Sequence, residues 1–449
     1  MTISIPAKSL KVAIIGAGPG GLATAIALSK VPNTEVTLYE KAKVLREVGA
    51  GINVNANTWN VLRLLGVAES LTSGHRVLTI LNVSMYDQKN PADKTAICFA
   101  CPSSPWYSPS IQGLERTEDL GGEGVRLYFL DDVDNSLKKV VRDSAWPTYD
   151  LQFTGTTIWR ALVPRAQLRN LDPRFDTTAW WHLPTSHVYF SPVSEDLSEI
   201  ASREVQDPRI HGANKLSWGV PVTNEEVESH FTVSSRTDSG HLHPLTDEQN
   251  YLPQIQAALK KVEAGAWREF AAFAGPELSQ LRAWDNKVAL VGDASHALSG
   301  AFGSGAAFAM EDGLILAQAL AYFKNDLSKA LPLFDSIRLP YYTRMYAVLE
   351  MGAKSRKERL EHLSNPTEED MIRAKVIKSG GGAMDWIYEN KIDEVWEDAI
   401  KEYERKESNK VERREEDRLW QTIQAFRVFE TSNICPTTRH GDKTWSCKR

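Results

Sequence analysis

The pattern of apolar and polar positions divides the chain into segments with different periods. Residues 10–40 contain an unbroken apolar run, a glycine-rich turn, a helical pattern and a second strand that ends in Glu40. From about residue 154 to 270, apolar runs such as "HVYFSPV" and "KLSWGV" predict an antiparallel sheet. A second strand pattern, "KVALVGD", then leads through glycines and serines into the helical pattern "GAAFAMEDGLILAQALAYF". These periods predict an α/β fold in which two strand–glycine–helix units flank a sheet.

The first glycine turn has the spacing of a dinucleotide-binding motif. Gly16 permits the tight turn, Gly18 lets the backbone approach a pyrophosphate, and Gly21 allows the helix to lie close to the strand. A phosphate would meet the free N–H groups of the helix N-terminus. Glu40 ends the second strand where ribose hydroxyls need an acceptor. Glycines also recur in ordinary turns, but the order of strand, turn, helix, strand and acid favours a dinucleotide site.

The second glycine-rich stretch, "VGDASHALSGAFGSGAAF", covers residues 291–308. A strand that ends in Gly-Asp and opens through a loop onto a helix N-terminus is suited to a group with negative charge or carbonyl oxygens. The alternative is a serine- and glycine-rich loop that only caps the helix.

Composition favours small-molecule chemistry. The 449 residues contain 52 Lys and Arg against 58 Asp and Glu, so no global positive field indicates nucleic acid or an anionic membrane surface. No apolar run reaches the roughly 18–20 residues that span a bilayer. The N-terminal apolar run continues directly into glycines, unlike a signal peptide. We therefore expect a cytoplasmic protein with no membrane span and no nucleic-acid partner.

Cysteines and the charged tail carry little chemistry. Cys98 and Cys101 form one C-x-x-C, but Cys435 and Cys447 have a different spacing and no matching histidine pattern. We therefore expect free cysteines and no metal site. Residues 354–414 mix both charge signs in a helical pattern, which is typical of a solvated helix.

Four motifs in order resemble the FAD-dependent aromatic hydroxylases, the single-component flavoprotein monooxygenases, and within them the fungal salicylate hydroxylase-like group. The motifs are "IIGAGPGGLATAIAL" with Glu40, "REVGAGINVNANTWNVLRLLGV", "FTGTTIWRALVP" and "VALVGDASHALSGAFGSGAAFAMEDG". The resemblance implies a Rossmann-like FAD-binding domain with a parallel sheet, interleaved with a mainly antiparallel substrate domain and followed by a C-terminal helical region. It implies FAD-binding parts at 1–85 and 276–350, a substrate domain at 86–275 and a helical region at 351–449.

The resemblance also implies a set of cofactor-binding residues. Asp293 would meet the ribityl chain and the pyrophosphate side of the flavin, and the loop from Gly303 would lie at the pyrimidine edge of its ring. Arg116 is a degraded counterpart of an arginine that reaches the flavin. The complete set comprises Gly16, Gly18, Gly21, Glu40, Arg46, Ala50, Gly51, Arg116, Asp293, Gly303, Gly305 and Ala306.

Two residues are candidates for contact with a substrate. Arg160 matches a position that faces substrate or flavin, where its guanidinium can hold a carboxylate or phenolate, although a surface arginine near a strand end is the alternative. His187 lies on an expected strand, with Tyr189 on the same face. Ser191 replaces a tyrosine found in related strands. His230 is a weaker candidate, and His296 is interpreted as a scaffold residue of its loop.

The implied activity is hydroxylation of a small aromatic acid or phenol by a monomer or homodimer that uses FAD, NADH or NADPH, and O2. The sequence departs from the family between about residues 80 and 146, with an apparently shortened segment near 88–146, where Asp134, Ser136 and Arg142 stand in place of an Asp-Gly motif. Two alternatives therefore stay open. One is a different FAD oxidoreductase, such as an epoxidase of an isoprenoid side chain, and the other is a binding protein that has lost the flavin.

Overall fold

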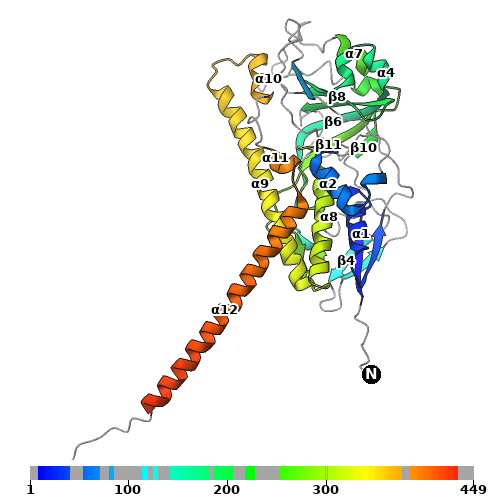
Figure 1. The fold of residues 1–449 in the computed structure, drawn as a ribbon. Helices are drawn as coiled ribbons and strands as arrows, with labels where there is room; N and C mark the ends of the chain where they lie inside the picture. Colours follow the sequence, from blue (N-terminus) through cyan, green and yellow to red (C-terminus); the bar gives the residue numbers. More distant parts are fainter. Residues whose placement is uncertain are drawn as a thin grey trace, which may run out of the picture. The chain divides into compact units, whose positions relative to one another are not determined.

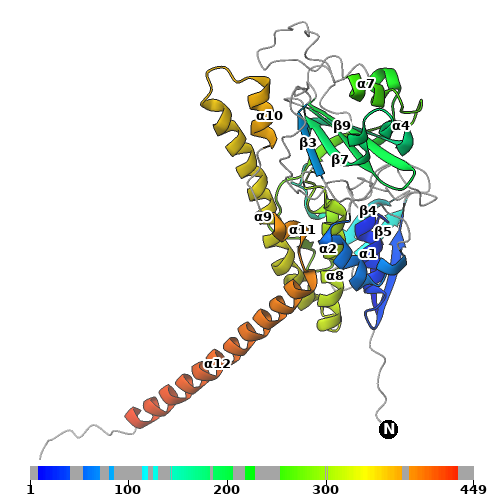
Figure 2. The same ribbon diagram turned by 45° about the horizontal axis from the view of Figure 1, so that its top comes forward.

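The computed structural model divides into two compact units, residues 1–392 and 393–449 (Figures 1 and 2). It describes residues 9–40, 54–70, 80–84, 114–119, 125–129, 142, 144–182, 186–205, 218–227, 253–298, 300, 302–376 and 384–432.

The chain begins with the predicted strand, turn and helix. Strand β1 (Leu10–Ile15) pairs in parallel with β2 (Thr34–Tyr39), and helix α1 (Pro19–Leu28) connects them. Pro19 suits the first helical position because the missing N–H has no partner there. Helix α2 (Ala56–Leu65) follows and ends at Gly66, whose φ of 79° closes the helix in the left-handed region. A short 3₁₀ helix, η1 (Ala68–Ser70), comes next.

A seven-stranded sheet forms the second layer of the first unit, in the order β10-β11-β6-β9-β8-β7-β3. Its neighbours are antiparallel except for β3 and β7, which run parallel. The strands are β3 (Ile80–Ser84), β6 (Gln152–Pro164), β7 (Thr178–His182), β8 (His187–Pro192), β9 (Leu197–Val205), β10 (Trp218–Pro221) and β11 (Arg268–Ala274). Two hairpins pair β4 (Leu114–Asp119) with β5 (Val125–Phe129) and β12 (Arg282–Ala283) with β13 (Val288–Ala289).

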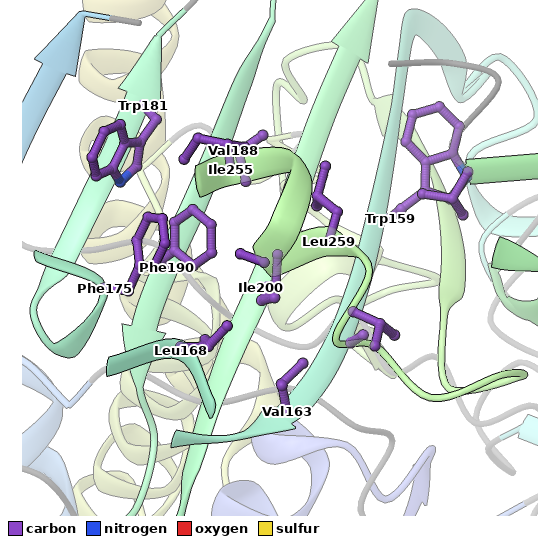
Figure 3. Packing of buried hydrophobic residues seen from close by; sticks show 14 of the residues in the cluster. Trp159, Val163, Leu168, Phe175, Trp181, Val188, Phe190, Ile200, Ile255 and Leu259 are labelled. Carbon is purple, nitrogen blue, oxygen red and sulfur yellow. The ribbon is translucent and has the colours of Figure 1, made fainter. Parts of the chain in front are cut away.

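One face of this sheet buries an aromatic and aliphatic core (Figure 3). Along β6, Trp159, Ala161 and Val163 point into that core, so alternation sends Arg160 to the opposite face. The rings of Phe175 and Phe190 stack with centroids 4.2 Å apart. The elements that contribute to this side are α4 (Arg165–Arg169), η3 (Pro173–Asp176) and α7 (Pro253–Leu259). The other face carries polar side chains such as Arg160 and Glu199 among apolar ones such as Ile158 and Leu162, and we call it the polar face.

The remaining elements are mainly helical. A short 3₁₀ helix, η5 (Gly292–Ala294), precedes α8 (Gly305–Tyr322), which is buried along most of its length. Helix α9 (Leu327–Glu361) follows, and α10 (Glu368–Val376) and α11 (Asp385–Tyr388) complete the first unit. Helix α12 (Ile392–Ser432) supplies the described residues of the second unit. No described helix combines the length and apolar character that a bilayer crossing requires.

The predicted fold class is confirmed: a Rossmann-like unit, a mainly antiparallel sheet and a helical C-terminal region are all present. Within the described ranges, the parallel sheet of the first motif has the two strands β1 and β2. Strand β3 instead pairs with β7 in the large sheet, with Ile80 opposite Thr178. The domain boundaries drawn from the sequence stay a prediction.

Candidate functional site

Close packing of α1 on α8 brings the two glycine turns together. A Cβ at Gly20 would lie 2.8 Å from the Cβ of Ala309, and a Cβ at Gly292 would lie at the same distance from that atom. Further along, a Cβ at Gly313 would lie 2.3 Å from Oγ1 of Thr24. Because Ala309 contacts both Gly20 and Gly292, the start of α1 and the second Gly-Asp turn are neighbours, although more than 270 residues separate them in the chain.

The first turn has the geometry that a pyrophosphate needs. Gly16 has a φ of 100°, which favours glycine, and a Cβ at Gly21 would lie 1.8 Å from the carbonyl oxygen of Gly16. Gly18 precedes α1 and offers no side-chain cap, so the backbone N–H groups at the start of this helix could receive a phosphate. The backbone N–H of Ala17 donates to Oε2 of Glu40 at 2.7 Å, which holds that carboxylate beside the turn. These residues fit the diphosphate and ribose of the FAD that the resemblance implies.

The second turn is fixed by backbone contacts. Gly292 has a φ of 61° and is buried, and its carbonyl accepts a hydrogen bond from Oγ of Ser295 at 2.9 Å. Asp293 follows within η5 and is half-buried. The turn therefore presents a partly accessible carboxylate on a rigid backbone.

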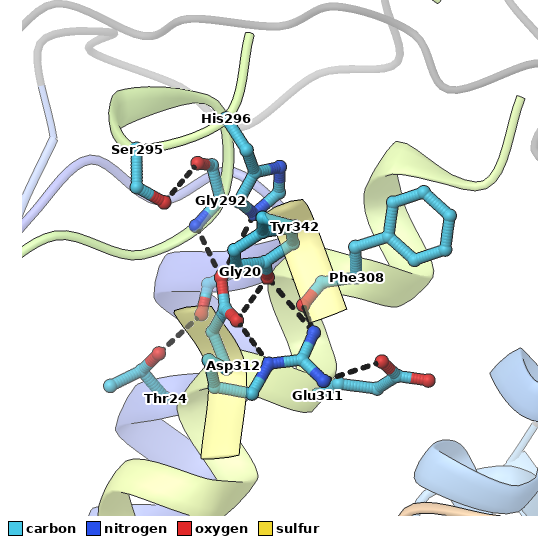
Figure 4. A network of polar contacts seen from close by, with 10 residues as sticks. Gly20, Thr24, Gly292, Ser295, His296, Phe308, Glu311, Asp312 and Tyr342 are labelled. Atoms are coloured by element: carbon cyan, nitrogen blue, oxygen red, sulfur yellow. Dashed lines mark hydrogen bonds and ion pairs between the residues drawn. The ribbon is translucent and has the colours of Figure 1, made fainter. Parts of the chain in front are cut away.

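Asp312 of α8 anchors this turn from inside the protein (Figure 4). Its Oδ2 accepts hydrogen bonds from the Gly292 N–H at 2.8 Å and from Nε2 of His296 at 3.0 Å. Its Oδ1 accepts from Nε of Arg338 at 2.7 Å and from the hydroxyl of Tyr342. Burial alone would raise the pKa of Asp312, but the Arg338 charge and the bonds from His296 and Tyr342 lower it to about 2. Asp312 is thus a buried anion at neutral pH.

The charge balance of this network depends on the adjacent carboxylate as well. Glu311 pairs with Arg338 at 3.0 Å and accepts a hydrogen bond from Asn390 at 3.0 Å. Burial raises the pKa of Glu311, although the Arg338 charge opposes that shift. Arg338 also donates to the Tyr342 hydroxyl at 2.9 Å, and the His296 ring stacks on Tyr342 with centroids 4.0 Å apart. His296 therefore supports the turn from a buried position.

The N-terminus of α8 lies beyond this turn. Gly303 has a φ of 65°, and Gly305 and Ala306 form the first helical positions. Ser304 precedes the helix without a side-chain cap, and its hydroxyl instead accepts a hydrogen bond from Nδ2 of Asn55 at 2.7 Å. The N-terminus of α8 carries the positive end of the helix dipole, at the position where the resemblance implies the pyrimidine edge of a flavin.

The polar face of the large sheet contains both predicted catalytic residues. Arg160 is buried and forms an ion pair with Glu199 on the neighbouring strand. His187 is half-buried, and its ring centroid lies 5.7 Å from that of His182. Tyr189 lies 4.9 Å from Trp180 between ring centroids. The positive charge of Arg160 is thus paired with a carboxylate of the protein, that of Glu199.

Several predicted residues cannot be placed in the site. Arg116 lies on β4, where the structure describes the backbone and Tyr128 is its partner. Ser191, at the position of the missing tyrosine, forms a hydrogen bond of 2.8 Å with Oγ1 of Thr178. The residues that fall outside the described ranges are Arg46, Ala50, Gly51, Cys98, Cys101, Asp134, Ser136 and His230.

Sequence reasoning missed a junction between the sheet and the second turn. Arg142 lies over the ring of Tyr149 at 4.6 Å, and the Tyr149 hydroxyl would lie 1.9 Å from a Cβ at Gly275. Gly275 donates to the Ala297 carbonyl at 2.9 Å. Burial raises the pKa of Tyr149, the Arg142 charge opposes this, and Asp293 is near enough to add to the rise. Arg142, which belongs to the residues that stand in place of the Asp-Gly motif, is therefore connected through Tyr149 and Gly275 to the Gly-Asp loop.

The buried acids were also missed, although the sequence carried a signal. Glu311 and Asp312 interrupt an otherwise apolar helical pattern, and buried carboxylates require partners. Within the described ranges, no group of three or more His, Cys, Asp or Glu side chains is placed to hold a metal ion.

Comparisons with known proteins agree with this geometry. A protein-family model described as an NAD(P)-binding Rossmann-like domain matches residues 14–46. The chain is 26% identical over 386 residues to 3-hydroxybenzoate 6-hydroxylase of Klebsiella oxytoca, covering 77% of this chain and 89% of the relative. It is 21% identical over 439 residues to a 6-methylsalicylate 1-monooxygenase of Aspergillus terreus, covering 87% and 92%.

Solved structures show the same fold. A salicylate hydroxylase in complex with its substrate matches with a TM-score of 0.60 and 20% identity, covering 87% of this chain and 98% of that one. HpxO of Klebsiella pneumoniae, in complex with FAD and uric acid, matches with a TM-score of 0.57 and 17% identity, covering 86% and 93%. The predicted resemblance to FAD-dependent aromatic hydroxylases is confirmed.

Proposed function

Because this chain is a relative of the FAD-dependent aromatic hydroxylases, we propose that it is a monooxygenase that hydroxylates a small aromatic acid with FAD, a reduced nicotinamide and O2. The observation that carries the proposal is the pairing of two glycine turns through Ala309. One turn offers a helix N-terminus and Glu40, and the other offers Asp293 on a fixed backbone. Together they suit the two ends of a long, polar dinucleotide.

In the proposed reaction each part of the chain would have its own task. The first turn would hold the diphosphate, Glu40 the ribose, and Asp293 the ribityl chain. Bound FAD supplies the redox chemistry and the activation of O2. The N-terminus of α8 would stabilise negative charge at the ring edge through its backbone N–H groups. The large sheet would cover the reacting ring, orient the substrate and exclude water.

Aromatic acids are the favoured substrate class. The two sequence relatives named above act, by their names, on 3-hydroxybenzoate and 6-methylsalicylate, and both compounds combine an aromatic ring with a carboxylate and a hydroxyl group. The polar sheet face of this chain offers arginine, histidine and tyrosine side chains to such a ligand. We further propose that the reductant is NADH or NADPH, that the protein is a monomer or a homodimer, and that it is cytoplasmic.

The roles of Arg160 and His187 remain predictions. The ion pair with Glu199 favours a role for Arg160 in stabilising the sheet, because its positive charge already has a buried partner. His187 is half-buried on the polar face, which supports contact with a ligand.

The absorbance spectrum of the purified protein is the first test. We expect bound FAD, oxidation of NADH or NADPH that an aromatic acid accelerates, and a hydroxylated product that carries one oxygen atom from ¹⁸O₂. Nicotinamide oxidation without product, with every acid tried, would favour another FAD oxidoreductase. Failure to bind FAD after reconstitution would favour the binding-protein alternative.

A further inference from the structure

A row of basic side chains crosses the polar face of the large sheet. His182 on β7 lies opposite His187 on β8, and His187 lies opposite Arg203 on β9. Cross-strand partners point to the same face, so these three side chains are neighbours. The face is the one opposite the aromatic core, because Trp181, Val188 and the other core residues alternate with them.

Arg203 is the unbalanced member of this row. It is half-buried, and within the described part of the chain its guanidinium forms no hydrogen bond or ion pair. Burial, and then the like charge of Arg356 in α9, lower the pKa of Arg203. A partly buried cation near a second cation is unfavourable until an anion lies between or beside them. Arg160 differs, since Glu199 already neutralises it.

Measured along β6, Arg203 lies closer than Arg160 to the strand end that joins the second glycine turn. Arg203 is opposite Ile158, whereas Arg160 is two residues further along β6, or about 7 Å. The N-terminal end of β6, six residues before Ile158, pairs Gln152 with Ala274, and the next residue, Gly275, donates to Ala297 of the Gly-Asp loop. A small anion held at Arg203 would therefore lie nearer than one at Arg160 to the strand end that joins the Gly-Asp loop.

We propose that Arg203, flanked by His187, binds the carboxylate of the aromatic acid and thereby selects acids over neutral aromatics. This inference rests on the proposed function and names a specificity residue for it. A planar guanidinium can hold a carboxylate through two parallel hydrogen bonds, and a half-buried position strengthens them. The histidine ring beside it can donate a further hydrogen bond or contact the aromatic ring.

Calorimetric titration of the FAD-loaded protein tests the site without turnover. The probes are salicylate and 3-hydroxybenzoate, each with its neutral amide. For Arg203→Gln we expect the Kd of both acids to rise by about 10- to 100-fold, as for loss of a charge-assisted hydrogen-bonded pair. The Kd of the amides should change by less than about 3-fold, since they lack the charge. Arg203→Lys should give an intermediate loss, because it keeps the charge but not the planar fork.

The control is Arg169→Gln, which removes an exposed arginine that pairs with Asp176 on the far side of the core. It should leave all four affinities unchanged. Equal losses for acids and amides would show a structural role and overturn the proposal, as would unchanged affinity for the acids in Arg203→Gln. A parent protein that binds neither acid would also overturn it, and so would a variant that changes only NADPH affinity. Binding as expected without hydroxylation would refute the proposed function and leave the carboxylate site intact.

Discussion

Asp312 is the residue on which the second turn depends. Asp312→Asn removes the charge that balances Arg338 and weakens the bonds from Gly292 and His296. Breaking a buried ion pair from one side costs about 3–5 kcal/mol, so we expect a loss of that order in the free energy of unfolding. Flavin retention should fall as well, because the Gly292 backbone loses its anchor. Chemical denaturation and the ratio of flavin to protein absorbance measure the two effects.

Glu311→Gln is the matched control for that variant. Glu311 is equally buried and pairs with the same arginine, but burial raises its pKa, so its charged form is already disfavoured. We expect a smaller loss of stability and near-normal flavin content. Equal effects of the two substitutions would contradict the assignment of Asp312 as the anchor.

The same carboxylate gives the protein a defined acid sensitivity. The pKa of Asp312 is about 2, below its ordinary value of 3.8, so its contribution to stability is complete above about pH 4. That contribution, about 2 kcal/mol for such a shift, is lost as the pH falls through 2. The difference in unfolding free energy between the parent and Asp312→Asn should therefore shrink between pH 4 and 2. A difference that stays constant over this interval would refute the assignment.

Gly21 tests the first turn at the level of one methyl group. In Gly21→Ala the new Cβ would lie 1.8 Å from the Gly16 carbonyl oxygen, which belongs to the backbone and cannot move aside cheaply. We expect loss of FAD and a lower melting temperature. Gly352→Ala is the control, because no atom lies within 4 Å of its Cβ in helix α9, and it should raise stability by about 0.5–1 kcal/mol. Normal FAD content in Gly21→Ala would contradict the dinucleotide assignment.

At the scale of elements, the pair between β6 and β9 holds the middle of the large sheet. Glu199→Gln leaves Arg160 as a buried charge without its counter-ion, and we expect a loss of about 3–5 kcal/mol in stability. The double variant Arg160→Met with Glu199→Leu should recover most of that loss, because apolar residues of similar volume replace buried ion pairs well. Denaturation of Glu199→Leu, Arg160→Met and the double variant, each compared with the parent, gives the coupling energy. Additive losses would show that the pair is not coupled, and a specific loss of substrate affinity in Arg160→Met would restore the predicted catalytic role.

At the scale of the whole molecule, the proposed site is contained in the first unit. Every side chain in the Asp312 network and both glycine turns precede residue 392. A chain shortened to residues 1–392 should therefore keep its FAD content and its melting temperature within about 4 °C, the shift that roughly 1 kcal/mol produces. Spectroscopy and calorimetry of the shortened protein check this. Loss of FAD from a folded shortened chain would place part of the site in α12.

The sequence was sufficient for what depends on local order. Gly16 and Gly21, the strand that ends at Glu40, and the helix that begins at Gly305 follow from spacing and period, and the structure has them in the expected elements. Partners that meet across strands or helices were out of reach. Arg160 and Glu199 are 39 residues apart and meet only through the register of β6 and β9, which the connecting segments set. The meeting of Asp312 with Arg338 likewise depends on how α9 packs against α8.

The contact of Ala309 with both Gly20 and Gly292 has a consequence for how the protein folds during its synthesis. The two turns can meet only after residue 309 has been synthesised and has left the ribosome. Until then the proposed cofactor site is incomplete. Contacts of such long sequence separation close slowly, because the loop entropy is lost before the contact forms. Under the proposed function, FAD would therefore bind late and stabilise only a nearly finished fold. Adding riboflavin, the precursor of FAD, during expression should change the yield of folded protein more than the rate at which the chain is synthesised.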